Sequence, residues 1–174
     1  MKTLLLEIYR MSPMWLCVLC AAAALGFGLL ERRMRRRSWW RRMLVGLLFG
    51  WAVAVLYATV LNRGGGAQGS FELVPLHSYR EVIATGHREI LRSSFMHVLL
   101  FFPAGLLGAA LLPRIRGRAL WLVLMAAVFS LTVEWLQFRF ALGNAEADDV
   151  FHNALGALLG ALGFGLRDVF VADP

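Results

Sequence analysis

Long apolar stretches alternate with short polar ones along most of the chain. Each apolar stretch approaches the length that an α-helix needs to cross the hydrocarbon core of a bilayer, roughly 20 residues. A helix satisfies its own backbone hydrogen bonds in lipid, so these stretches indicate membrane-spanning helices. We therefore expect an all-α polytopic transmembrane bundle forming a single membrane domain, with five spans over residues 13–30, 43–61, 95–112, 119–138 and 150–170.

Composition and charge support a membrane protein and argue against a nucleic-acid-binding one. Of the 174 residues, 59% are hydrophobic, and the net charge is +7. The densest group of arginines lies in ERRMRRRSWWRR, residues 31–42, with an apolar span on each side. Arginines and tryptophans in such a loop are typical of a cytoplasmic membrane anchor. We expect membrane lipid as a partner and no nucleic acid.

The distribution of arginines also predicts the topology. If residues 31–42 lie in the cytoplasm, the N-terminus lies outside and the loop 62–94 lies outside as well. Alternation then places PRIRGR (113–118) inside, the acidic segment 139–149 outside and the C-terminus inside. A four-span arrangement, with the C-terminus outside, is the alternative.

One segment of the expected outer loop has helical periodicity. Apolar side chains recur at helical spacing over residues 78–93, and charged side chains occupy the other positions. This pattern predicts an amphipathic helix on the outer leaflet, which would lie as a lid over the outer end of the bundle. A disordered surface loop is the alternative, because Thr85 and Gly86 weaken the helix.

The densest group of polar residues in the apolar part of the chain lies in SLTVEWLQFRFALGNAEADDVFHNALG, residues 130–156. Helical spacing places three of them on one face of the fourth span and others on a stripe of the fifth span. An ionisable side chain within a span is costly, and therefore indicates a function by default. We predict an extracytoplasmic polar site formed by Ser130, Glu134, Gln137, Asp148, Asp149, His152 and Asn153, with His97 of the third span at the same depth.

Glycines of the fifth span lie on the same helix face as its polar residues. Gly156 and Gly160 form a G-x-x-x-G pattern in the fifth span, and Gly46 and Gly50 repeat this spacing in the second. Small residues at this spacing allow neighbouring membrane helices to pack closely. We expect the fifth span to pack closely against a neighbour beside the polar residues.

Three interpretations of this site compete. Carboxylates and imidazoles can bind a divalent metal, but their spacing here matches no known ligand signature, so we predict no metal. Glu134 is a candidate general acid or base, although no nucleophile motif accompanies it. The residues could also form a binding pocket without chemistry, or a hydrogen-bonded network that only joins helices.

Three blocks of sequence resemble the VanZ-like family, membrane proteins named for a teicoplanin-resistance accessory protein. The first is ELVPL (72–76), where Glu72 and Leu76 replace the usual Asn and Phe. The second is MHVLLFFPAGLLG (96–108), with His97 where Asn is common. The third and most specific is S-x-x-x-E-x-x-Q at 130–137 followed by E-x-D-D-V-x-H-N-x-L-G at 146–156.

The resemblance implies a multi-pass protein of the bacterial cytoplasmic membrane, linked to glycopeptide antibiotic resistance and needing no cofactor. We expect the polar site to bind an envelope molecule, such as a lipid-linked cell-wall precursor or a glycopeptide. One alternative is a membrane-embedded hydrolase or transferase that uses Glu134 as acid or base on a lipid-linked substrate. Another is a structural or assembly subunit without its own ligand. The oligomeric state stays open.

Overall fold

The computed structural model describes residues 22, 26, 27, 29–62, 70–87, 89–112 and 117–170. Within these residues, four helices are long and apolar enough to cross a membrane. They are α3 (Ser38–Leu56, continued by the π-helical turn η1, Tyr57–Leu61), α5 (Glu89–Leu111), α6 (Arg118–Arg139) and α7 (Ala147–Phe170). The first expected span, 13–30, lies largely outside the described residues.

These four helices coincide with the other four expected spans, so the predicted all-α helical bundle is confirmed. Each helix begins before its apolar stretch does, because hydropathy marks the apolar core and helical hydrogen bonding continues into the flanking polar residues. The first turn of α7 contains Asp148 and Asp149. Carboxylates are favourable there, because they face the positive end of the helix dipole.

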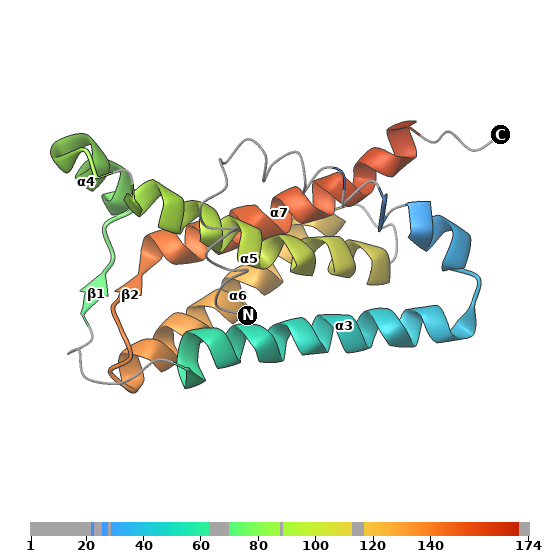
Figure 1. Ribbon diagram of the computed structural model, residues 1–174, viewed down its shortest axis with the longest axis horizontal. Coiled ribbons are helices and arrows are strands. Elements are labelled where there is room, and N and C mark those ends of the chain that lie inside the picture. The colour runs from blue at the N-terminus through green and yellow to red at the C-terminus, as the bar shows by residue number, and fades with distance from the viewer. Residues whose placement is uncertain are drawn as a thin grey trace.

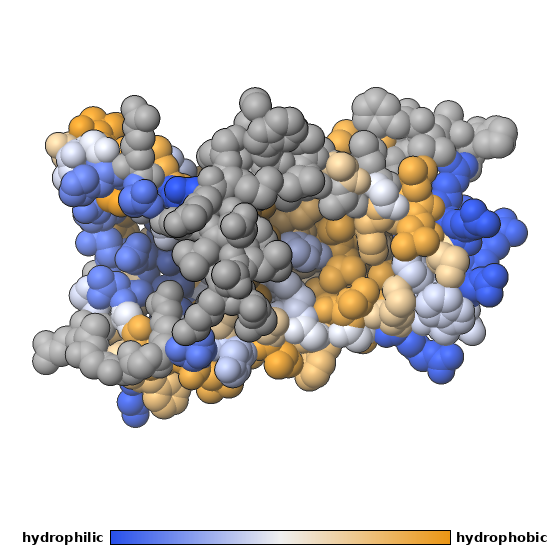
Figure 2. Space-filling model, in the orientation of Figure 1, coloured by the Kyte–Doolittle hydropathy of each residue, from blue (hydrophilic) through white to orange (hydrophobic). Residues whose placement is uncertain are grey.

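The two ends of the bundle differ in chemistry. We call the end that carries the start of α3 and the arginines of residues 32–42 the arginine end. The opposite end, the loop end, carries the short helix α4 (His77–Thr85) and a pair of two-residue strands, β1 (Phe71–Glu72) and β2 (Ala145–Glu146) (Figure 1). Hydrophilic residues gather at both ends and hydrophobic residues lie between them (Figure 2).

The most extensive helix contact among the described residues joins α5 to α7, which run side by side (Figure 1). A Cβ atom at Gly156 would overlap the Val98 carbonyl oxygen, and one at Gly160 would overlap the Phe102 carbonyl oxygen. The missing side chains thus let the backbones of α5 and α7 touch, as the G-x-x-x-G pattern predicts.

The second glycine pair behaves differently. Gly46 and Gly50 of α3 have no described atom within 4 Å of the position that a Cβ would take. Both residues are exposed on the outside of the described bundle. The same spacing therefore marks close packing in α7 but not in the described surroundings of α3.

The expected continuous helix over 78–93 is wrong, because the chain forms two separate helices there. α4 ends at Gly86, which has a φ of 72°, and its N–H donates to the Val82 carbonyl at 2.8 Å. A left-handed glycine is a common way to end a helix. The residues from Glu89 onward are the first turns of α5. Only the first half of the expected amphipathic segment therefore forms a separate helix beside the bundle end.

The two short strands hold the segment before α4 against the loop between α6 and α7. β1 and β2 pair in parallel, with Phe71 opposite Ala145 and Glu72 opposite Glu146. The Ala145 N–H also donates to the Ser70 carbonyl at 2.9 Å. This pairing brings residues more than 70 positions apart together at the loop end.

Candidate functional site

The structure gathers the predicted polar residues at the loop end, on α5, α6 and α7. Six of the eight are buried, each at most 5% exposed, although all six are polar or charged. Burying polar groups is costly unless they are hydrogen-bonded, so their partners define what the cluster does. The six are Ser130, Glu134, Gln137, Asp148, His152 and Asn153; His97 and Asp149 are partly exposed.

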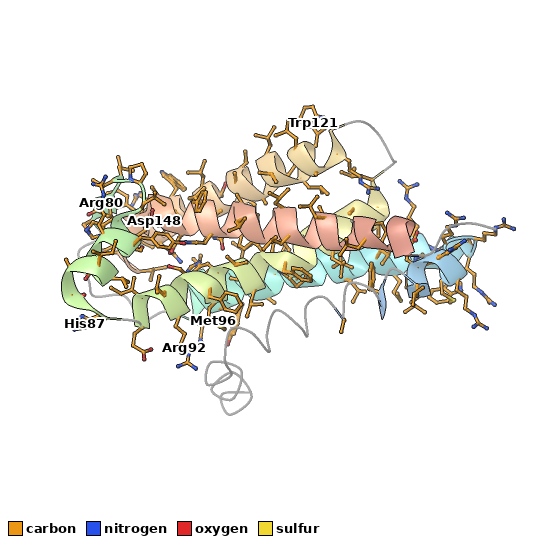
Figure 3. The ribbon with its side chains drawn as sticks, turned by 90° about the horizontal axis from the view of Figure 1, so that it is seen from above. Arg80, His87, Arg92, Met96, Trp121 and Asp148 are labelled. Carbon is orange, nitrogen blue, oxygen red and sulfur yellow. The ribbon has the colours of Figure 1, made fainter. Side chains whose placement is uncertain are left out.

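Asp148 binds the backbone at the start of α4. Its Oδ1 accepts a hydrogen bond from the Leu76 N–H at 2.6 Å, and its Oδ2 accepts one from the Ser78 N–H at 2.8 Å. The first N–H groups of a helix have no partner within the helix, and α4 has no side-chain cap of its own. A carboxylate from α7 therefore caps α4 and holds it against the bundle; Figure 3 shows Asp148 beside α4.

His152 also contacts α4. Its Nε2 shares a hydrogen bond of 2.8 Å with the Tyr79 hydroxyl, and the two rings lie 5.7 Å apart between centroids. His152 is 2% exposed, and its Nδ1 has no hydrogen-bond partner among the described residues. Asp148 and His152, one helical turn apart on α7, thus bind successive parts of the same helix.

Two further hydrogen bonds join α6 to α7 and to η1. The Asn153 side-chain amide donates to the Ser130 Oγ at 2.8 Å, which links α7 to α6. The Gln137 side-chain amide donates to the Thr59 carbonyl at 3.1 Å, which links α6 to η1. Both bonds tie helices together, so these residues build the frame of the site, although the Asn153 Oδ1 has no hydrogen-bond partner among the described residues.

His97 and Asp149 link α5 to α7 at the edge of the cluster. The His97 Nε2 lies 3.4 Å from the Asp149 Oδ2, and each side chain is about one-fifth exposed. The contact is an ion pair only when His97 is protonated. The pair lies nearer to solvent than the rest of the cluster, as its exposure shows.

A pocket of about 430 Å³ opens beside the cluster, between α6 and the start of α7. Glu134 is the one predicted site residue that lines it. The Glu134 Oε2 accepts a hydrogen bond from the Glu146 N–H at 3.1 Å, so the carboxylate is held at the pocket wall. The other lining residues are Leu73, Leu131, Trp135, Ala145, Glu146, Ala147 and Val150.

Glu146 gives the pocket a second carboxylate. Burial, followed by the neighbouring carboxylate of Asp149, raises the pKa of Glu146 above its ordinary value. Its side chain is therefore protonated at a higher pH than that of a solvated glutamate, and a protonated carboxyl can donate as well as accept. The pocket thus holds one carboxylate fixed by a backbone bond and one that is easier to protonate.

The sequence prediction did not include Glu146 and Tyr79 among the site residues. Glu146 precedes α7 and lies outside the helical stripe that selected the others, yet it begins the E-x-D-D block. Tyr79 belongs to the segment expected to be a lid. It lies 73 positions from His152 in the sequence, and only the fold brings the two side chains into contact. In the described part of the chain, no group of three His, Cys, Asp or Glu residues could hold a metal ion.

Neither a curated protein nor a solved structure matches the chain. The profile of one family, VanZ/LLP1, matches residues 43–168, which include α5, α6, most of α3 and α7, and every residue of the polar cluster. This match covers well over half of the chain and agrees with the apolar helices in indicating a membrane protein. The chain belongs to the VanZ/LLP1 family.

Proposed function

We propose that this membrane protein binds an envelope molecule in the loop-end pocket, and that this binding lowers susceptibility to glycopeptide antibiotics. The pocket itself carries the proposal, because it combines two carboxylates with apolar side chains that face outward. Leu73, Leu131 and Trp135 line it and are between 56% and 71% exposed. A molecule with a polar group and a lipid chain, such as a lipid-linked cell-wall precursor, matches both parts; a glycopeptide is the other ligand we consider.

The size and chemistry of the pocket support a ligand of this kind. Its volume of about 430 Å³ lies within the range of small-molecule sites. The carboxyl groups of Glu134 and Glu146 accept hydrogen bonds from the hydroxyl and amide groups that sugars and peptides carry. Tryptophan is favoured at the membrane–water interface, where Trp135 would meet the junction of headgroup and chain.

The other predicted residues would act indirectly. Asp148 and His152 hold α4, while Asn153 and Gln137 join α6 to its neighbours. In this proposal they position the pocket walls, and the ligand meets Glu134 and Glu146. Substitutions in the frame should therefore lower stability together with binding.

The proposal places the loop end outside the bacterial cytoplasmic membrane and the arginine end in the cytoplasm, with the N-terminus outside and the C-terminus cytoplasmic. The arginines of residues 32–42 support this orientation. A periplasm-sensitive reporter fused after residue 142 should report an outside position, and one fused after residue 116 an inside position. The reverse result would remove the premise that the pocket faces the envelope.

Two neighbouring positions of α7 test the pocket. Val150→Trp fills the pocket, and we expect it to weaken binding of a lipid-linked cell-wall precursor to the purified protein by about ten-fold or more, which corresponds to about 1.4 kcal/mol. Phe151 does not line the pocket and is 51% exposed, so Phe151→Trp should leave binding nearly unchanged. The measurements are equilibrium binding and the teicoplanin susceptibility of cells that express each variant. Equal effects of the two substitutions would contradict the proposal.

A hydrolase or transferase is the second candidate, because Glu134 is 5% exposed yet lines the pocket. A carboxylate in this position can act as a general acid or base. Applied to Glu134→Gln, the same assays separate the two functions, since glutamine keeps an acceptor for the Glu146 N–H but removes the carboxylate. Full resistance in this variant excludes acid–base chemistry, whereas lost resistance with retained binding supports it.

A third candidate is a structural or assembly subunit. If Asp149→Asn and Asn153→Ala lower only expression, those residues are structural, as in an assembly subunit.

A further inference from the structure

A second cavity, separate from the loop-end pocket, lies between α3, α5 and α6. It measures about 320 Å³. It is lined by Gly105 and Gly108 of α5, by Leu48 and Ala52 of α3, and by Leu122 and Met125 of α6. Met125 is 61% exposed, so this side of the cavity borders the outside of the described bundle. We call this cavity the apolar groove, because apolar residues line it throughout.

On the side of the loop end, the groove ends at Trp51 and Phe129. The rings of Trp51 and Phe129, which both line the groove, lie 5.4 Å apart between centroids. Trp51 is fixed by a hydrogen bond from its Nε1 to the Leu100 carbonyl at 2.8 Å. Nearer the loop end, the Gln137 amide binds the Thr59 carbonyl and joins α6 to η1. The other lining residues run from these two rings toward the arginine end, so the groove extends in that direction.

The groove suits a lipid chain better than water or another helix. An apolar cavity gives water no hydrogen-bond partners and stays dry. A helix with its side chains is about 10–12 Å in diameter, which is too wide for a cavity of this size. An acyl chain is thin, flexible and apolar, and it surrounds helices such as these in a bilayer.

Charge at the arginine end indicates the headgroup. Arg41, Leu48 and Ala52 lie at positions i, i+7 and i+11 of α3, and therefore on one helix face. Arg41 is exposed at the arginine end of that face, where nitrogen-bearing side chains extend beyond the helices in Figure 3. A guanidinium group binds phosphate oxygens with two parallel hydrogen bonds. We propose that the apolar groove holds one acyl chain of an anionic phospholipid, whose phosphate is bound by Arg41.

The first test compares two alanines of α3. Ala52 lines the groove, whereas Ala54 is exposed on another face. Native mass spectrometry of the full chain should show one retained phosphatidylglycerol in preference to phosphatidylcholine. Ala52→Phe should abolish that retention and Ala54→Phe should preserve it. Equal retention of both lipids by the wild-type protein, or equal losses in the two variants, would refute the proposal.

The second test concerns the headgroup and does not alter the groove. Arg41→Gln should weaken phosphatidylglycerol binding by about five-fold, since one arginine near an anionic membrane contributes about 1 kcal/mol. Arg42 lies about 100° around the helix from Arg41, so Arg42→Gln should have a smaller effect. Equal effects of the two substitutions, or no effect of either, would contradict phosphate binding by Arg41.

A cysteine placed at Ala52 tests the other occupants. Oxidation of Ala52→Cys should give no disulfide if a lipid chain fills the groove. A disulfide within one chain to the native Cys17 or Cys20 would mean that residues 13–30 occupy it, and a disulfide between two chains would mean that a second copy does. Either disulfide would overturn the lipid proposal; Ala54→Cys serves as the control for random collision.

Discussion

Gly160→Leu should destabilise the bundle by about 3 kcal/mol, whereas Gly165→Leu on the same helix should leave it almost unchanged. A Cβ at Gly160 would overlap the Phe102 carbonyl oxygen and approach the Leu106 backbone nitrogen. Both obstacles belong to the backbone of α5, so a leucine cannot be accommodated by rotating a neighbouring side chain. The helices must move apart, which removes packing contacts along the α5–α7 interface.

Gly165 is the matched control because no described atom lies within 4 Å of the position of its Cβ. Replacing a helical glycine by leucine also raises helix propensity, by somewhat less than about 1 kcal/mol, so Gly165→Leu should be neutral or slightly stabilising. Unfolding of the purified protein in mixed micelles, followed by helical circular dichroism, measures both variants. Similar stabilities for the two would show that α5 and α7 do not touch at Gly160.

Asp148→Ala should release α4 from the bundle and destabilise the protein by about 3 kcal/mol. The substitution removes the acceptor of two backbone bonds, from Leu76 at 2.6 Å and from Ser78 at 2.8 Å. The Ser78 N–H bond is buried, and a buried donor left without a partner bears its full desolvation cost. The first turn of α4 also loses a negative charge close to the positive end of its dipole.

Asp149→Ala is the control, because Asp149 lies in the same turn of α7 but pairs with His97 at 3.4 Å in a partly exposed position. Its loss leaves both Asp148 bonds to the start of α4 intact, so it should destabilise α4 less than the loss of Asp148 does. Hydrogen exchange of the amides in residues 77–85 measures the result locally. We expect faster exchange in Asp148→Ala and near-normal exchange in Asp149→Ala. Unchanged protection of α4 in Asp148→Ala would mean that other contacts hold this helix.

Hydropathy alone predicted the four described spans and their order. This prediction succeeded because a bilayer accepts only segments that are apolar and satisfy their own backbone bonds, and both properties are local to the sequence.

The prediction of one continuous helix over 78–93 was wrong, and the reason is also local. Its periodicity continued across Gly86, but this glycine has a φ of 72° and ends α4 there. Periodicity describes side chains, whereas the backbone conformation decides where a helix ends.

The sequence also selected the cluster, since spacing along two helices brings Ser130, Glu134, Asp148 and His152 to one end of the bundle. It did not reveal their partners. Asp148 binds α4 across 72 positions, and His152 meets Tyr79 across 73 positions. Such pairs depend on how loop and helices fold back on one another, and helical period carries no information about that.

By itself, the sequence determined that this is an all-α membrane bundle, which of its residues are too polar for lipid, and that they gather at one end. The tertiary structure alone decided which of them line a pocket and which cap or join helices. Among the predicted residues, Glu134 faces the pocket, while Asp148 and Gln137 bind backbone groups. It also decided that α3 and α6 leave a groove beside α5. The physical reason is that composition and period act along one segment, whereas cavities and buried hydrogen bonds arise between segments.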